Sequence, residues 1–196
     1  MNIKRIFLLD DKELIKKFLQ GDDNSFNQLA KRYIDKIYWH SRRILGNHFD
    51  ADEIVQQVLV VMYEKLHTFN SDSSLYTWIY KITYTRSLNL LKKNSIKRFF
   101  GIDDENGNEI PSEYSTMENL ENKEMLGLID KALLKIPPKQ REVFSLRHFE
   151  ELSYQEISNI TGKSIGSIKA NYFHAFNKLK EILGMDEVEA RNGKEN

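Results

Sequence analysis

Apolar residues recur every three or four positions along most of the chain, which is the spacing of one face of an α-helix. A first run over residues 14–19 stops at Gly21, and the polar side chains of residues 22–24 are candidate caps for a second helix that ends at Gly46. The apolar face of this second helix consists of Phe26, Leu29, Tyr33, Ile37 and Tyr38. The pattern therefore predicts two successive helices near the beginning of the chain.

Two further helices are predicted before residue 94. Asp50, followed three positions later by Glu53, has the spacing of a capping box, so we expect the third helix to begin at Asp50. The polar loop NSDSS at residues 70–74 ends it, and a fourth amphipathic helix is predicted from about Leu75 to Lys93. The apolar face of the third helix consists of Ile54, Val58, Val61, Met62 and Leu66.

Residues 101–122 show neither the helical spacing of apolar residues nor the alternation typical of a strand, and they are polar and acidic. This stretch is therefore predicted to be a linker. Helical spacing returns with Met125, Leu128, Ile129, Leu133 and Ile136. Pro138 suits the first turn of a helix running to about Phe149. The last 13 residues, 184–196, are predicted to be a frayed tail.

A helix-turn-helix is the strongest local signal. Ser153 and Glu156 form a capping box for a short helix, Gly162 suits the left-handed turn that ends it, and Ser164 can cap the longer helix that follows. We expect the longer helix to bury Ile165, Ile168, Tyr172, Ala175 and Leu179. Its opposite face would present duplex DNA with Ser164, Ser167, Lys169, Ala170, Asn171, Phe173 and His174. The alternative is a helical hairpin that only packs against the rest of the protein and does not bind DNA.

Composition supports a helical, globular protein and excludes several kinds of site. Hydrophobic residues make up 40% of the 196, and only 9 Gly and 3 Pro leave little material for a turn-rich β fold. The absence of cysteine excludes disulfides, thiolate metal sites and a cysteine nucleophile. The short apolar run at residues 6–9 is followed at once by charge, so we expect neither a signal peptide nor membrane insertion.

The formal net charge of zero weighs against a nucleic-acid partner until the distribution of charge is considered. Residues 81–98 contain six cations and no acid, whereas residues 103–121 contain acids and no base. The net charge of zero therefore does not describe the local charge, because a basic segment is followed by an acidic one.

Aromatic residues and cations share the predicted fourth helix, as expected of a surface that binds unpaired nucleic acid. The candidate residues for single-stranded DNA are Tyr76, Trp78, Tyr80, Lys81, Tyr84, Arg86, Asn89, Lys92 and Lys93. The alternative is that the aromatic rings belong to the core and the cations to a solvated face. The third helix offers a candidate protein-docking face near its start, which consists of Asp52, Glu53, Gln56 and Gln57. The alternative there is simple stabilisation of the helix dipole by acids.

Four segments in this order resemble bacterial RNA polymerase sigma factors of the extracytoplasmic-function (ECF) group. DEIVQQ at residues 52–57 resembles the family's acidic pair followed by Leu-Val-Gln-Glu, and SLYTWIYKI at residues 74–82 resembles its aromatic promoter-melting segment. IPPKQREVF at residues 136–144 resembles its Leu-Pro-x-x-x-Arg-Glu-Val-Phe signature, and residues 153–169 resemble its helix-turn-helix. The resemblance covers about residues 10–183.

The resemblance implies an all-α fold with two helical domains joined by a flexible acidic linker. Residues 10–98 would form sigma region 2, residues 99–122 the linker and residues 123–183 sigma region 4. The docking face would bind the polymerase clamp, the aromatic helix would open and read the melted promoter edge, and the second domain would read the distal promoter element in duplex DNA.

The expected partners are therefore core RNA polymerase and promoter DNA, and the family allows an anti-sigma factor as a further one. We expect no cofactor, no metal, no small-molecule substrate and a cytoplasmic location. The sequence departs from the family pattern at Gln57, where an acid is usual, at Leu75, where an aromatic residue is usual, and at residues 84–85, where Arg-Asn is common.

Two other functions use the same segments. A helix-turn-helix regulator would bind duplex DNA without polymerase, and a sigma-like antagonist would bind polymerase without starting transcription. An enzyme is disfavoured, because the chain has no phosphate-binding glycine loop or nucleophile elbow and its histidines have no metal-binding spacing such as HExxH.

Overall fold

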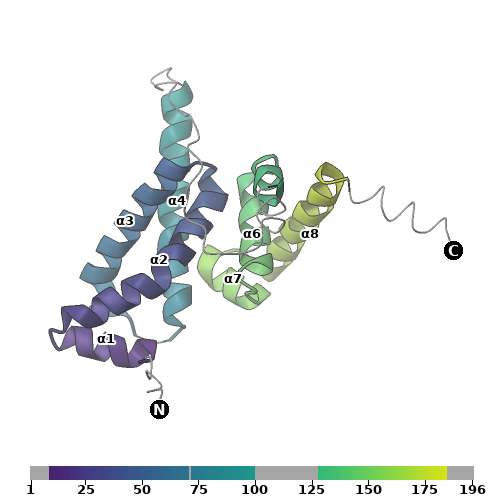
Figure 1. Cartoon of the computed structure of the whole chain (residues 1–196). Coiled ribbons are helices and arrows are strands. Elements are labelled where there is room, and N and C mark those ends of the chain that lie inside the picture. Colours follow the sequence, from purple (N-terminus) through teal and green to yellow (C-terminus); the bar gives the residue numbers. More distant parts are fainter. Residues whose placement is uncertain (1–8, 71, 100–127, 185–196) are drawn as a thin grey trace, which may run out of the picture.

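The computed structural model describes residues 9–70, 72–99 and 128–184, and every regular element in these ranges is a helix (Figure 1). Helices α1 to α4 form one bundle, and the later helices form a second, smaller group beside it (Figure 1). The helices are α1 (Asp11–Leu19), α2 (Asp23–Leu45), α3 (His48–Lys65), a 3-10 turn η1 (Leu66–Thr68), α4 (Leu75–Phe99), α6 (Pro138–His148), α7 (Tyr154–Thr161) and α8 (Ile165–Ile182). Residues 128–134 are also helical. The all-α expectation is confirmed, and the predicted linker lies almost wholly outside the described residues.

Side-chain caps fix the starts of most helices, and those of α2, α7 and α8 are at residues that the sequence predicts. Asp22 caps α2 by accepting a hydrogen bond from the Asn24 backbone N–H at 3.1 Å. The helix ends at Gly46, whose φ of 86° is the left-handed conformation that glycine adopts without steric penalty.

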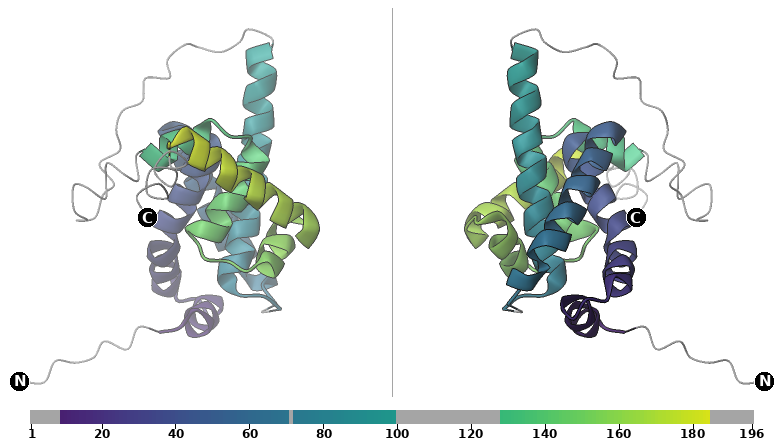
Figure 2. Two further views of the ribbon diagram at one scale, coloured as in Figure 1. Left: turned by 90° about the vertical axis from the view of Figure 1, so that its right-hand side faces the viewer. Right: turned by 90° about the vertical axis from the view of Figure 1, so that its left-hand side faces the viewer.

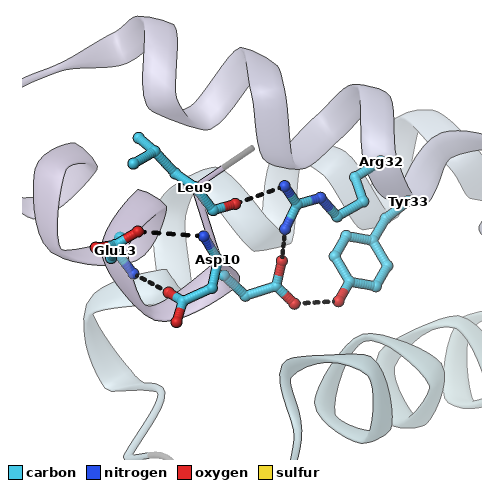
Figure 3. A network of polar contacts seen from close by, with 6 residues as sticks. Leu9, Asp10, Glu13, Arg32 and Tyr33 are labelled. Carbon is cyan, nitrogen blue, oxygen red and sulfur yellow. Dashed lines mark hydrogen bonds and ion pairs between the residues drawn. The ribbon is translucent and has the colours of Figure 1, made fainter. Parts of the chain in front are cut away.

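The first helix is held against α2 by a small polar network (Figure 3). Asp10 and Glu13 form a capping box at the start of α1. The Arg32 guanidinium of α2 donates to the Leu9 carbonyl at 2.8 Å and forms an ion pair with Asp11, which also accepts from the Tyr33 hydroxyl. These contacts orient α1 across the end of the bundle.

The predicted start of α3 is wrong by two residues. The helix begins at His48, and the N-cap is Asn47, whose side chain accepts a hydrogen bond from the Asp50 backbone N–H at 2.7 Å. Asp50 therefore lies in the first turn, where its carboxylate also accepts from Asn94 of α4 at 2.9 Å. The amide of Asn47 competes successfully for the cap, because asparagine caps helices about as well as aspartate does.

Helix α4 is longer than the sequence predicts, ending at Phe99 instead of about Lys93. It projects beyond the ends of its neighbours, which both views of Figure 2 show. Its last turns are rich in Lys and contain no helix breaker, so local propensity continues the helix past the bundle.

One apolar core fills the four-helix bundle and a second fills the space between α6 and α8. The bundle core includes Leu14, Leu29, Ile37, Ile54, Val58, Met62 and Ile79. The second core consists of Ala132, Leu133, Ile136, Phe144, Ala175 and Leu179. As predicted, α8 buries Ile168, Ala175 and Leu179. Ile165, in the first turn, is instead 37% exposed, and Tyr172 is only partly buried, stacked on Phe144 of α6.

A third core joins the two groups of helices. It combines Ile44, Tyr80 and Tyr84 of the bundle with Val143, Leu146, Leu152, Ile157, Ile160 and Ile168 of the second group. The two domains are therefore packed against each other in this structure. Across the described residues, no helix is both long and apolar enough to span a bilayer.

Candidate nucleic-acid and polymerase interface

The predicted strand-binding residues of α4 lie on two different faces of the helix. Successive residues of a helix are about 100° apart around its axis. Five of the predicted residues fall within an arc of about 140°, which we call the basic face. Three others fall within an arc of about 80° on the opposite side, which we call the tyrosine face. The basic face consists of Lys81, Arg86, Asn89, Lys92 and Lys93, all exposed. The tyrosine face consists of Tyr76, Tyr80 and Tyr84.

Trp78 lies within the arc of the basic face. Its indole ring is partly buried against the bundle core, with its centroid 5.9 Å from that of Phe69. The start of α4 is fixed nearby by Ser74, whose hydroxyl accepts a hydrogen bond from the Thr77 backbone N–H at 3.1 Å. Trp78 is thus the aromatic ring that the fold places beside the exposed cations.

The tyrosine face is covered by the second domain. Tyr80 is fully buried and Tyr84 is 7% exposed, and both pack in the core that α6, α7 and the start of α8 complete. Tyr76 and Tyr80 stack with ring centroids 4.2 Å apart, and the Tyr76 hydroxyl donates to Glu150 at 2.5 Å. The role of these tyrosines in strand binding stays a prediction, and in this arrangement two of the three rings have almost no solvent contact.

Burial also fixes the charge of these tyrosines. Desolvation is the main reason why the pKa values of Tyr76, Tyr80 and Tyr84 are raised well above that of an exposed tyrosine. A neighbouring carboxylate raises the pKa further in each case: Glu150 for Tyr76 and Tyr80, and Glu142 for Tyr84. All three phenols are therefore neutral hydrogen-bond donors.

The docking face of α3 points away from the bundle core. Glu53 and Gln56 are exposed, and Asp52 and Gln57 are half-buried. Gln57 donates to Glu53 at 2.9 Å across one turn, and Asp52 lies 3.1 Å from the His48 ring. The face therefore offers preoriented carboxylate and amide oxygens to a partner that carries hydrogen-bond donors.

Helices α7 and α8 have the geometry predicted for a helix-turn-helix. Ser153 and Glu156 form the capping box of α7, and Gly162 ends that helix with a φ of 69°. The Ser164 hydroxyl accepts a hydrogen bond from the Ser167 backbone N–H at 3.3 Å and so caps α8. The turn between the helices is therefore held at both ends by local hydrogen bonds.

The predicted DNA-reading residues of α8 form one open surface. Ser164, Ser167, Lys169, Ala170, Phe173 and His174 are exposed. Asn171 is half-buried and its amide donates to the Ser167 carbonyl at 2.7 Å. The Lys169 ammonium lies 5.6 Å from the centre of the Tyr154 ring, so α7 contributes to its position.

Several charged residues that join the two domains were not expected from the sequence. Arg141 and Glu142 are 7% and 1% exposed, and Arg43, Glu150 and Lys163 contact residues of the opposite domain. The one available signal was that Arg141 and Glu142 fall in the IPPKQREVF segment. Within the described ranges, no group of three or more His, Cys, Asp or Glu side chains could hold a metal ion.

Comparisons with known families and proteins agree with these observations. The family model Sigma-70 region 2 matches residues 29–96, and the model Sigma-70, region 4 matches residues 126–179. The chain is 28% identical to the ECF RNA polymerase sigma factor SigW of Bacillus subtilis, across 88% of this chain and 96% of that protein. It is 27% identical to the ECF RNA polymerase sigma-E factor of Escherichia coli, across 85% and 91%.

Solved structures show the same fold. The sigma factor RpoE of Bartonella quintana, determined in complex with the anti-sigma factor NepR, matches with a TM-score of 0.67 and 24% identity over 82% of this chain and 98% of that one. CnrH, determined in complex with the cytosolic domain of CnrY, matches with a TM-score of 0.65 and 21% identity over 90% and 98%.

The sequence, the fold and both matched regions agree. The two family models cover different parts of the chain, in the order that the sequence predicts, and the relatives match over nearly their whole length. Members of this family are transcription initiation factors without a catalytic centre of their own. The chain therefore belongs to the sigma-70 family of RNA polymerase sigma factors, as a member of its ECF group.

Proposed function

We propose that this ECF sigma factor directs core RNA polymerase to promoters through three separate surfaces, one for the polymerase and two for DNA. The observation that carries the proposal is the basic face of α4, which exposes four cations and an asparagine beside Trp78. Residues 81–98 contain no acid that would offset their positive potential. A long basic helix with an aromatic ring near its start suits a separated DNA strand.

The basic face would hold the melted promoter strand by two kinds of contact. Its cations would follow the phosphates, and the Trp78 ring would stack on a base, an interaction worth about 1–3 kcal/mol. The predicted first domain, residues 10–98, supplies this whole surface.

The docking face of α3 would bind the polymerase clamp. Asp52, Glu53 and Gln57 are held by contacts along the helix, so these three side chains have less freedom to lose on binding. Glutamine at position 57 can accept hydrogen bonds but carries no charge. Its attraction to a basic partner is therefore weaker than that of an acidic residue at the same position.

The exposed surface of α8 would read duplex DNA in the major groove. Small residues near its capped start, Ser167 and Ala170, allow the helix end to approach the groove floor. Lys169 would contact a phosphate, and Phe173, which is 61% exposed, would make apolar contact with thymine methyl groups.

Binding at two DNA sites explains how a chain with no net charge can find a promoter. Each surface alone is weak, and the polymerase holds the second domain, residues 123–183, close to its site, so that it binds at a high effective concentration. The protein would act where the polymerase is, in the cytoplasm, without a cofactor or a small-molecule substrate. An anti-sigma factor is a further proposed partner, since both structural relatives were determined in complexes.

Transcription in vitro with purified core polymerase tests the proposal. The chain should start RNA synthesis at defined promoter positions. A variant with Lys81→Glu and Lys92→Glu on the basic face should lose promoter opening while still binding the polymerase. A variant with Lys16→Glu and Lys17→Glu, both exposed on α1, makes the same change of charge away from the face and should transcribe normally.

The result also separates the rival functions. Specific duplex binding by the purified chain alone, without transcription on adding polymerase, would indicate an independent helix-turn-helix regulator. Polymerase binding without transcription from any promoter would indicate an antagonist. Equal activity of the two charge-reversal variants would remove the basic face from strand opening.

A further inference from the structure

The amide of Asn171 is held in one orientation on the exposed surface of α8. Its nitrogen donates a hydrogen bond to the Ser167 carbonyl at 2.7 Å and a second one to the Ser167 hydroxyl oxygen at 3.4 Å, one helical turn earlier. A primary amide has two N–H donors and one carbonyl acceptor. Both donors of Asn171 are therefore directed at Ser167, and its carbonyl oxygen is left for a partner outside the helix.

The Ser167 side chain has the complementary role. Its hydroxyl oxygen accepts from the Asn171 amide, and among the described residues the hydroxyl itself donates to no acceptor. The Ser167 backbone N–H donates to the Ser164 hydroxyl at 3.3 Å, which orders the first turn of α8. Ser167 and Asn171 thus present one donor and one acceptor side by side.

This pair lies on the part of α8 that would face the groove floor. Four side chains fall within an arc of about 100° around the helix, namely Ser167, Ala170, Asn171 and His174. All of them are exposed except Asn171, which is half-buried. Ala170 offers only a methyl group, and the His174 ring can donate or accept according to its tautomer. Of these four side chains, the Ser167–Asn171 pair therefore has the defined hydrogen-bond pattern.

The bases differ in the pattern that they show in the major groove. Adenine has the N7 acceptor beside the N6 amino donor, guanine has two acceptors, thymine has the O4 acceptor, and cytosine has an amino donor without a neighbouring acceptor. A protein surface with one donor beside one acceptor matches adenine. Against guanine or thymine, the Asn171 oxygen would face another acceptor.

We propose that Ser167 and Asn171 together read one adenine of the distal promoter element, with the Asn171 carbonyl accepting from the N6 amine and the Ser167 hydroxyl donating to N7. The inference rests on the proposed function of α8 in reading duplex DNA, and it adds the base that is selected. The pair makes the two contacts that a single asparagine makes when both ends of its amide are free. Because the amide is already ordered by Ser167, it has less freedom to lose on binding.

The hydrogen-bond pattern sets the size of the selectivity. Loss of one neutral hydrogen bond lowers affinity by about 2- to 13-fold. Guanine or thymine at the same position would leave the Asn171 oxygen without a donor in a desolvated interface, which lowers affinity by about 5- to 150-fold. Deleting one group from adenine should therefore cost less affinity than placing a wrong base there.

Selection of duplex DNA by core polymerase carrying the full chain tests the proposal. The probe is a duplex library randomised over the distal promoter element. The wild-type complex should prefer adenine at one position, and Asn171→Ala should lose the preference at that position. Asn177→Ala is the matched control, because Asn177 is exposed further along the same helix, and it should leave every preference unchanged.

Changes of single groups in the selected adenine then separate the two contacts. Purine in its place lacks the N6 amine, and should lower the affinity of the wild-type complex by about 2- to 13-fold without affecting Asn171→Ala. 7-Deazaadenine lacks N7, and should lower wild-type affinity by a similar factor without affecting Ser167→Ala. General unfolding cannot give this crossed result, and both substitutions introduce alanine, the strongest helix former.

The outcomes separate this inference from the proposed function. Unchanged preferences for Asn171→Ala would overturn the inference, and so would guanine, thymine or cytosine at the position that depends on Asn171. Equal losses of affinity for purine in the wild type and in Asn171→Ala would overturn it as well. In each case the proposed function stands if the complex still selects and transcribes promoter DNA. If the wild-type complex selects no sequence and starts no transcription, the proposed function fails and the inference fails with it.

Discussion

Replacing Gly46 with alanine should weaken the contact between the two domains. Gly46 ends α2 with a φ of 86°, and a Cβ atom added there would lie 2.7 Å from Cδ2 of Leu134 in the opposite domain. Gly21 ends α1 with a φ of 97°, and a Cβ atom added there would meet nothing within 4 Å. The two glycines therefore share the backbone conformation and differ in what lies beside it.

The comparison of Gly46→Ala with Gly21→Ala separates two effects. Alanine in the left-handed conformation costs about 1–2 kcal/mol at either position. At position 46, Leu134 must also leave its preferred rotamer or shift, which costs about 0.5–1.5 kcal/mol more. Separation of the two groups of helices relieves only the clash with Leu134. Gly46→Ala should therefore raise the fraction of molecules in which the two groups are separated by about 2- to 13-fold, and Gly21→Ala should leave that fraction unchanged.

The assay combines chemical denaturation with energy transfer between dyes at Lys16→Cys and Asn177→Cys. Both alanine variants should lose stability, and only Gly46→Ala should lower the transfer efficiency in the absence of denaturant. Leu134→Ala added to Gly46→Ala should recover part of the difference, because it removes the atom that the new Cβ meets. If both variants lose equal stability and show equal transfer, Gly46 does not act through the domain contact, and the reasoning is refuted.

Three further changes have defined outcomes. Glu151 has a φ of 54°, so Glu151→Gly should stabilise the chain by about 1 kcal/mol in thermal denaturation, and a lower melting temperature would contradict this. His40 is fully buried, and desolvation, with a smaller contribution from Arg43, lowers its pKa from 6.5 to about 3. As the pH falls, His40 is therefore protonated in the unfolded chain before it is protonated in the folded one. Its contribution to the free energy of unfolding is fully present above pH 6.5 and falls by up to about 1.4 kcal/mol per pH unit as the pH drops from 6.5 towards 3. His40→Leu should remove this slope in denaturation profiles measured at several pH values, and parallel profiles would rule out His40 as its source. Lys169→Ala should weaken promoter binding by the polymerase complex across sequences and lower the salt dependence by about one unit, whereas lost preference at one base with intact affinity would exclude a phosphate contact.

Local signals made most helix ends predictable from the sequence. Ser153, Glu156 and Gly162 set the bounds of α7, because capping hydrogen bonds and a left-handed glycine depend only on neighbours within a few residues. The predicted start of α3 was wrong because Asn47 and Asp50 are both suitable N-cap residues. The choice between them also involves Asn94 of α4, which is far away in the sequence.

The division of α4 into two faces could have been drawn from helical geometry, but the burial of one face could not. Tyr80 and Lys81 are adjacent in the sequence, and only the packing of a second domain makes one inaccessible and leaves the other exposed. The same holds for Arg141, whose partners include backbone carbonyls at residues 43 and 44, to which no sequence pattern points. Helix caps and the division of a single helix into faces were thus predictable, and contacts between domains were not.

The placement of tyrosines and cations on opposite sides of one rigid helix has an evolutionary consequence. If the outward lysines hold the promoter strand as we propose, a substitution among them alters strand binding and leaves the packed core untouched, because these side chains are exposed. A substitution among the inward rings alters the core that joins the two groups of helices. Under that proposal, strand binding and the packing between the two groups of helices can be selected separately within a single stretch of about 20 residues.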